Sequence, residues 1–144
     1  MSDFNFESFI AKAKPRVEDV TIYPLDLTAQ ITVAADAAEE AKGAEKKRLE
    51  TERDELRQQM EAAALTVKVR ALTSAELLKV NGGDDEAAAR ALEISLACVE
   101  PAFTSEQAER IVQELPYTES SKILAKINEL TFSEVKTPDF SPAS

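Results

Sequence analysis

The side chain best suited to covalent chemistry is the thiol of Cys98, the only cysteine in the chain. A reactive thiolate is stabilised by a helix N-terminus or by neighbouring cations. Cys98 instead lies near the predicted C-terminal end of a helix, with the carboxylate of Glu100 close by. Both features favour the neutral thiol, so we expect a buried, unreactive cysteine that packs as a small hydrophobic residue. A single cysteine also excludes an internal disulfide and suits a reducing cytoplasm.

The string NGGDDE at 81–86 is the most enzyme-like stretch of the sequence. Two glycines followed by carboxylates could bind a divalent cation, and the string is superficially similar to the GGDEF signature of cyclic dinucleotide synthases. It lacks the aromatic residue of that signature, and it lacks the acidic spacing of a calcium loop. A structural interpretation explains every residue, because glycine ends one helix and Asp84 or Asp85 begins the next. We therefore expect no metal site here.

The remaining composition excludes most catalytic chemistry. The chain has no histidine, no tryptophan and only three glycines. It therefore lacks the imidazole and thiolate clusters of zinc sites, the base of a hydrolytic triad and the glycine-rich loops that bind phosphate. Paired acids such as Glu106 and Glu109 would need a pocket to shift their pKa values, and their helical spacing gives no sign of one. The sequence predicts a non-enzymatic protein with no catalytic, metal-binding or cofactor-binding residues.

The charge of the chain points to proteins as partners. The 144 residues carry a net charge of −10, which argues against binding to nucleic acid or to an anionic membrane. No stretch approaches the roughly 20 apolar residues that span a bilayer, and Met1–Ile10 lacks the features of a signal peptide, so we do not expect export. Eleven acids and four bases lie between Asp84 and Glu134, so this part of the chain holds most of the negative charge. Acidic helices of this kind suit either a solvated surface or a module that binds a basic segment.

The elements that position these residues begin with strands. Residues 17–25 and 27–33 are rich in Val, Ile, Thr and Tyr, and both are strand candidates, the first interrupted by Pro24. Residues 65–72 alternate apolar and polar side chains, which is the clearest strand pattern in the chain. Between them, residues 36–64 are rich in Ala, Glu, Lys, Arg and Leu and predict a long charged helix or a helical hairpin. Its apolar stripe is thin, so we expect it to project into solvent, although a coiled coil with a second copy stays open.

From Leu72 onward the pattern changes to about four short helices. The strings TSAE at 73–76 and TSEQ at 104–107 are capping boxes, and Thr118 is expected to cap the last helix. One helix is predicted to run through about Val99 before Pro101 ends it. The residues predicted to form the core of this bundle follow helical spacing and are Leu92, Leu96, Phe103, Ile111, Leu115, Ile123, Leu124 and Ile127.

The fold class expected from these patterns is mainly α with a small β element. Residues 1–35 are expected to form an N-terminal arm with short strands, 36–64 the charged projecting helix and 65–132 the helical domain. Residues 133–144 read as a flexible tail with two prolines and one large apolar residue, Phe140.

The order of the C-terminal elements carries a family resemblance. The sequence TVKVRALTSAELLKV is followed by LACVEPAFTSEQAERIVQELP and by a final helix, SSKILAKINELTF. Residues 65–134 thereby resemble the tail assembly chaperones of long-tailed bacteriophages. In that family a V-x-V-R-x-L-T-x-x-E opening leads to a P-x-x-T-x-E-Q turn and a final helix near L-x-x-x-I-x-x-L. The N-terminal half is similar to the variant found in phages of actinobacterial hosts.

The resemblance implies a non-enzymatic chaperone that binds the tape measure protein, and its own longer frameshifted form where one exists. It implies a location in the cytoplasm of the infected bacterium and absence from the mature virion. It carries over no catalytic residues. Apolar residues off the main helical stripes are predicted to border the partner groove, and these are Ile94, Tyr117 and Phe132.

Two other functions stay open at this point. A structural subunit of the tail or virion would be found in purified particles. An acidic adaptor or inhibitor of a basic host protein would form a complex that weakens sharply with salt, because surface charges are screened over about 8 Å at physiological ionic strength. Self-association stays open in each case, because the helix at 36–64 could pair with a second copy or project alone.

Overall fold

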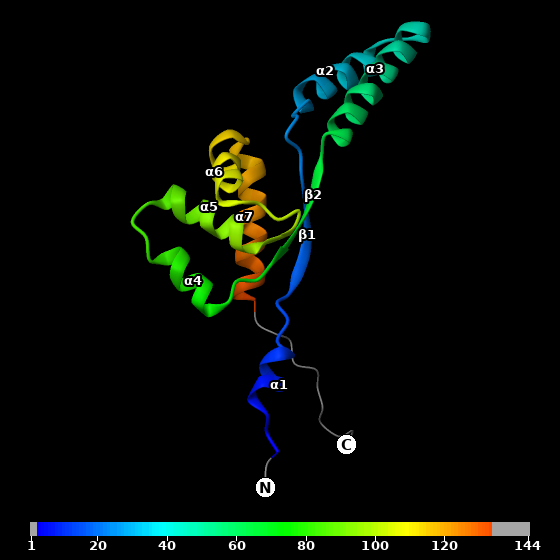
Figure 1. The fold of residues 1–144 in the computed structure, drawn as a ribbon. Helices are drawn as coiled ribbons and strands as arrows, with labels where there is room; N and C mark the ends of the chain where they lie inside the picture. Colours follow the sequence, from blue (N-terminus) through cyan, green and yellow to red (C-terminus); the bar gives the residue numbers. More distant parts are fainter. Residues whose placement is uncertain (1–2, 134–144) are drawn as a thin grey trace, which may run out of the picture.

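The computed structural model describes residues 3–133, which form seven helices and a three-stranded antiparallel sheet. The fold is mainly α with a small β element, as the sequence predicted. Figure 1 shows a long helical hairpin above a short sheet and a helical bundle beside that sheet. In chain order the elements are α1 (Phe6–Ala11), β1 (Val17–Ile22), α2 (Thr28–Glu40), α3 (Gly43–Ala62), β2 (Leu65–Arg70), α4 (Ser74–Asn81), α5 (Glu86–Ala97), β3 (Cys98–Glu100), α6 (Ser105–Glu114) and α7 (Tyr117–Phe132).

The sheet has the order β1-β2-β3, and its two longer strands form the predicted half-buried pattern. Val20 pairs with Val67 across β1 and β2, and both side chains are buried. Thr21 and Thr66 pair on the other face, where their hydroxyls share a hydrogen bond of 2.9 Å in solvent. The alternation of the two strands therefore sets one apolar face against the helices and one polar face against water.

The helices α2 and α3 form a hairpin that is inserted between β1 and β2. They pack mainly against each other, and Figure 1 shows them projecting away from the sheet. Only Ala34 and Ala38 are buried in this pair, and α3 has no buried residue. The chain reverses at Gly43, whose φ of 63° lies in the left-handed region that glycine adopts without strain. Of the two predicted forms, the structure has the helical hairpin.

The strand predicted at 27–33 is wrong, because Thr28–Val33 is the first part of α2. The β-branched residues of this stretch favoured a strand by composition. Leu27, Ile31, Ala34 and Ala38 nevertheless follow one another at spacings of four, three and four residues, which is a helical stripe. That stripe packs against α3, and packing outweighs the weak intrinsic preference of the β-branched side chains.

Three of the four C-terminal helices, α4, α5 and α6, begin where the local signals predicted. Thr73 with Glu76, and Thr104 with Gln107, form complete capping boxes. Asp85 caps α5 by accepting hydrogen bonds from the amides of the second and third following residues. These starts were predictable because each cap is a contact within four residues of chain.

Two helix ends differ from the prediction. The helix expected to run through Val99 ends at Ala97, and Cys98 begins β3, where it pairs with Val69 of β2. The last helix begins at Tyr117 with Pro116 as its N-cap residue, so Thr118 lies inside α7 instead of capping it. Proline fits this place because it needs no amide partner and its fixed φ suits the entry into a helix.

The core lies between the buried face of the sheet and the helices α4, α5, α6 and α7. Its largest fully buried side chains are Val67 and Val69 from β2, Ile94 from α5, and Ile123 and Ile127 from α7. Burying a side chain of this size contributes roughly 1.5–3 kcal/mol. The other residues assigned to the core from sequence are partly buried and pack against this cluster, namely Leu92, Leu96, Phe103, Ile111, Leu115 and Leu124.

The N-terminal segment joins this core through β1. Val20 and Ile22 belong to the main apolar cluster, so residues 17–22 share one core with the C-terminal helices. The boundary expected between residues 35 and 36 falls inside helix α2. Helix α1 precedes the sheet and was not predicted; its phenylalanines are exposed. Arg16 holds the end of α7 by donating a hydrogen bond to the carbonyl of Leu130. The predicted tail at 133–144, with Phe140, lies outside the described residues except for Ser133.

Candidate functional site

Cys98 is buried in the core at the first position of β3. Burial raises the pKa of its thiol to about 12, so the sulfur stays protonated near neutral pH. A protonated, buried thiol is a poor nucleophile and a poor metal ligand. The structure thus places Cys98 in the environment that the sequence predicted, although on a strand and not on a helix.

The NGGDDE string forms the connection between α4 and α5. Gly82 is the C-cap residue of α4, and the carboxylate of Asp85 is engaged by backbone amides at the start of α5. Within residues 3–133, no three Cys, Asp or Glu side chains are grouped so that they could hold a metal ion. No helix of that same part of the chain is both long enough and apolar enough to cross a membrane.

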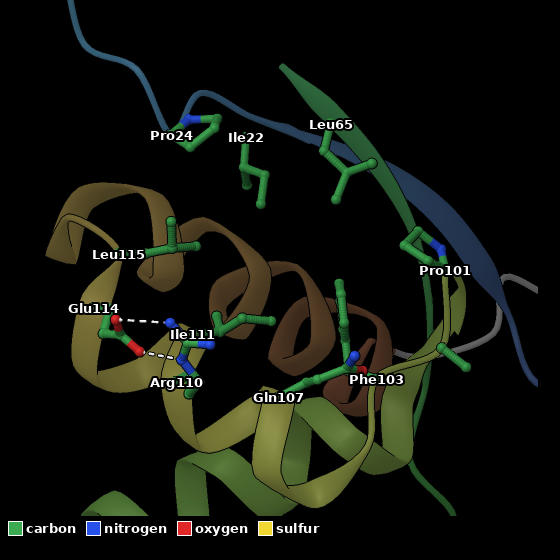
Figure 2. Close-up of a pocket in the computed structure, with 11 residues that line it drawn as sticks. Ile22, Pro24, Leu65, Pro101, Phe103, Gln107, Arg110, Ile111, Glu114 and Leu115 are labelled. Atoms are coloured by element: carbon green, nitrogen blue, oxygen red, sulfur yellow. Dashed lines mark hydrogen bonds and ion pairs between the residues drawn. The ribbon is translucent and has the colours of Figure 1, made fainter. Parts of the chain in front are cut away.

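A groove of about 470 Å³ lies between the end of the sheet and α6. We call it the apolar groove. Figure 2 shows Ile22, Leu65 and Pro24 on one side of it, with Ile111 of α6 and Leu115, the residue after that helix, facing them. The residues that line it are Ile22, Pro24, Leu65, Pro101, Ala102, Phe103, Gln107, Arg110, Ile111, Glu114 and Leu115.

Local structure holds both walls of the apolar groove in place. Ile22 and Leu65 are paired residues at the ends of β1 and β2, beside the base of the α2–α3 hairpin. On the other wall, the Thr104 capping box fixes the start of α6, and Ala108 anchors that helix in the core. The groove side of α6 carries residues at positions 107, 111 and 115, one helical turn apart.

The apolar groove has one charged pair, at its rim. Arg110 donates hydrogen bonds to both carboxylate oxygens of Glu114, and Figure 2 shows these two contacts. The hydrogen bond lowers the pKa of Glu114 and raises the pKa of Arg110. Both side chains stay charged and neutralise each other, so the groove presents a mainly hydrocarbon surface.

A second groove of about 440 Å³ lies between α5, α6 and α7. We call it the Glu93 groove, and it shares no lining residue with the apolar groove. Its lining residues are Glu86, Arg90, Glu93, Val112, Tyr117, Ser120, Ser121, Leu124, Ala125 and Asn128.

The structure separates the three residues predicted to contact a partner. Tyr117 is 72% exposed and lines the Glu93 groove. Phe132 is also exposed, at the last residue of α7. The prediction for Ile94 is wrong, because its side chain is fully buried among α5, α7 and the sheet and cannot reach a partner in the folded protein.

Sequence reasoning missed the apolar groove. It assigned Phe103, Ile111 and Leu115 to the core, where they are only partly buried. A signal for the sheet side was present in Leu65, which extends the apolar face of Val67 and Val69 to the first position of the strand. Nothing in the sequence indicated that Ile22 would pair with it 43 residues away.

No protein family model, curated protein or solved structure matches this chain.

Proposed function

We propose that this protein is a non-enzymatic tail assembly chaperone that binds the tape measure protein of a bacteriophage before the tail is assembled. The observation that carries the proposal is the apolar groove, an open hydrocarbon surface bordered by one neutralised ion pair. The resemblance of residues 65–134 to that chaperone family supplies the partner. The site of action would be the cytoplasm of the infected bacterium, and the mature virion would lack the protein.

The physical basis is the burial of an apolar stripe. A long helical protein that has not yet found its assembly partners exposes apolar side chains at helical spacing, and such stripes drive aggregation. The apolar groove can accept side chains from successive turns of such a helix, because apolar side chains line both of its walls and its charged pair is neutralised. The net charge of −10 on the chaperone would keep the complex soluble.

The environments of the reactive side chains support a binding role. Cys98 is protonated and buried, and Asp85 and Glu76 serve as helix caps. Neither groove holds a nucleophile paired with a base at hydrogen-bonding distance among the described residues.

The test is co-expression with the long, helix-rich protein encoded immediately downstream. We expect wild-type protein to keep that partner in the soluble fraction and to co-purify with it. Leu65→Glu places a charge in the apolar groove at a residue that is already 39% exposed, so the fold should survive. Burying that charge against an apolar ligand costs on the order of 1–3 kcal/mol, which is roughly a 5- to 150-fold loss of affinity.

The matched control is Leu78→Glu, the same substitution at an exposed leucine of α4 that lies outside the groove lining. The proposal fails if both variants co-purify equally well, or if no long helical protein is encoded downstream. Mass spectrometry of purified particles separates a chaperone from a structural subunit, because only the subunit would be present in them.

A further inference from the structure

Glu93 is a largely buried acid whose carboxylate has no partner among residues 3–133. Its side chain lies on α5 and the residue is only 8% exposed. Within residues 3–133 it forms no hydrogen bond and no ion pair, whereas the other two buried polar residues, Glu119 and Ser120, have partners. Every fully buried side-chain oxygen within residues 3–133 has a hydrogen-bond partner, so the oxygens of the Glu93 carboxylate, which have none, keep some contact with solvent at the groove, where a ligand can reach them.

The Glu93 carboxyl lies in the wall of the Glu93 groove, where the balance of charge is negative. Burial raises the pKa of Glu93, and the charge of Arg90 opposes that rise. Arg90 does not pair with Glu93, because its guanidinium contacts the carboxylate of Glu86 at 2.6 Å. The groove thus presents one neutralised pair and one uncompensated acid.

The rest of the lining suits a cation at the end of an apolar stem. Val112, Leu124 and Ala125 provide aliphatic surface along which methylene groups can lie. The exposed ring of Tyr117 stands at the edge, where a cation can contact an aromatic face. The hydroxyls of Ser120 and Ser121 donate to backbone carbonyls of α7, which leaves their oxygens as acceptors.

We propose that the Glu93 groove binds an arginine side chain of a protein partner, with the guanidinium paired to the Glu93 carboxylate and the stem lying against Leu124. Arginine is favoured over lysine because its planar head can donate two hydrogen bonds to one carboxylate and can stack on Tyr117. The strong negative charge of the C-terminal helices would attract such a partner. This site is independent of the apolar groove and of the identity assigned to the partner there.

The test uses two dipeptides that differ only in the head group of one side chain, N-acetyl-Leu-Arg-amide and N-acetyl-Leu-citrulline-amide. Citrulline has the shape of arginine without its positive charge. Each is titrated into the full-length protein while backbone amide shifts are followed by NMR. We expect saturable shifts at Tyr117 and Ser121 with the arginine peptide, and at least tenfold weaker binding of the citrulline peptide.

Two variants locate the effect. Glu93→Gln removes the buried charge and should abolish the preference for arginine. Glu106→Gln removes an equal charge from an exposed position on α6 outside the groove, and should keep that preference. The proposal is overturned if wild-type protein binds both peptides alike or binds neither, or if Glu93→Gln retains the preference.

A second measurement uses wild-type protein alone, so it stays informative if Glu93→Gln does not fold. The pKa of the Glu93 carboxyl is followed by its ¹³C resonance with and without each peptide. A bound guanidinium should lower that pKa, because a nearby cation stabilises the carboxylate, and citrulline should leave it unchanged. The other titratable groups lining the groove, namely Glu86, Arg90 and Tyr117, are present in both titrations and provide the internal reference. An unchanged Glu93 pKa with the arginine peptide would contradict the pairing.

Discussion

The ion pair between Arg70 and Glu76 allows a quantitative test of what holds the sheet to the helices. Arg70 is the last residue of β2, and its guanidinium donates two hydrogen bonds to the Glu76 carboxylate, at 2.7 and 2.6 Å. Glu76 also accepts a hydrogen bond from the Thr73 amide and so completes the capping box of α4. Each side chain of the ion pair is only about one-fifth exposed. One carboxylate therefore joins the strand to the start of the helix.

The magnitude follows from the pKa of Glu76. The hydrogen bond with Arg70 is the main cause that lowers this pKa from 4.5 to about 2. At about 1.4 kcal/mol for each pKa unit, the difference sets a ceiling of about 3 kcal/mol, and partial exposure to solvent brings the expected value to about 2 kcal/mol. Because the folded-state pKa lies below the unfolded value, this stability is present above about pH 4.5 and is lost as the pH falls towards about 2.

The perturbation is Glu76→Gln, which removes the charge but keeps an acceptor for the Thr73 amide, since glutamine also serves in capping boxes. We expect a loss of about 2 kcal/mol at neutral pH, measured by urea unfolding followed by circular dichroism. The difference in unfolding free energy between wild type and Glu76→Gln should fall below half of its neutral value by about pH 3, because Glu76 is then protonated in the unfolded chain but still mainly ionised in the folded one.

A matched control is Glu114→Gln, which breaks an exposed pair of the same type on α6 and should leave unfolding unchanged. The reasoning is refuted if Glu76→Gln costs no more than this control at neutral pH. It is also refuted if the loss stays constant between neutral pH and about pH 3, because the lost energy would then not come from the charge.

Three further predictions concern the core, the thiol and the hairpin. Ile94→Ala should lower the free energy of unfolding by about 2–5 kcal/mol, because it leaves a cavity in the core, whereas Val33→Ala at an exposed position of α2 should lower it far less. Equal effects of the two substitutions in urea unfolding would contradict the burial of Ile94. Cys98 should react with a thiol reagent such as dithionitrobenzoate only after unfolding in urea, and rapid labelling of the native protein would show that the sulfur is accessible. Replacing residues 24–63 with Asn-Gly should leave the sheet and the C-terminal helices folded, because α2 and α3 pack mainly against each other. If circular dichroism showed that this shortened protein no longer unfolds cooperatively, the hairpin would be needed to support the core.

Features encoded by neighbouring residues could be predicted from the sequence. The capping boxes at Thr73 and Thr104 depend on contacts within a few residues, and the alternation of 65–70 reports directly which side chains face the core. The strand β3 could not be predicted in this way. It has three residues, and it exists because Cys98 and Glu100 pair with β2, about 30 residues earlier in the chain.

The error at Ile94 has a similar cause. The sequence pattern predicts one narrow apolar face on α5, and Ile94 lies off that face. In the structure α5 packs against α4, α6, α7 and β3, so a wide arc of its circumference is buried. A sequence gives the period of an apolar face, whereas the width of that face depends on how many neighbours surround the helix. The same limit hid the apolar groove, whose walls come from β1, β2 and α6.

Helix α6 lies between the two grooves and links their proposed roles. Ile111 lines the apolar groove and Val112 lines the Glu93 groove, and consecutive helical residues project about 100° apart. A partner that occupied both grooves would therefore wrap across α6. The partner's contact in the apolar groove would be insensitive to salt, because the burial of hydrocarbon drives that contact. The long-range attraction that brings the partner to the acidic surface is instead screened over about 8 Å at physiological ionic strength. Added salt should then slow association of such a partner while changing its dissociation rate little, because a pair at the buried Glu93 carboxylate is shielded from ions.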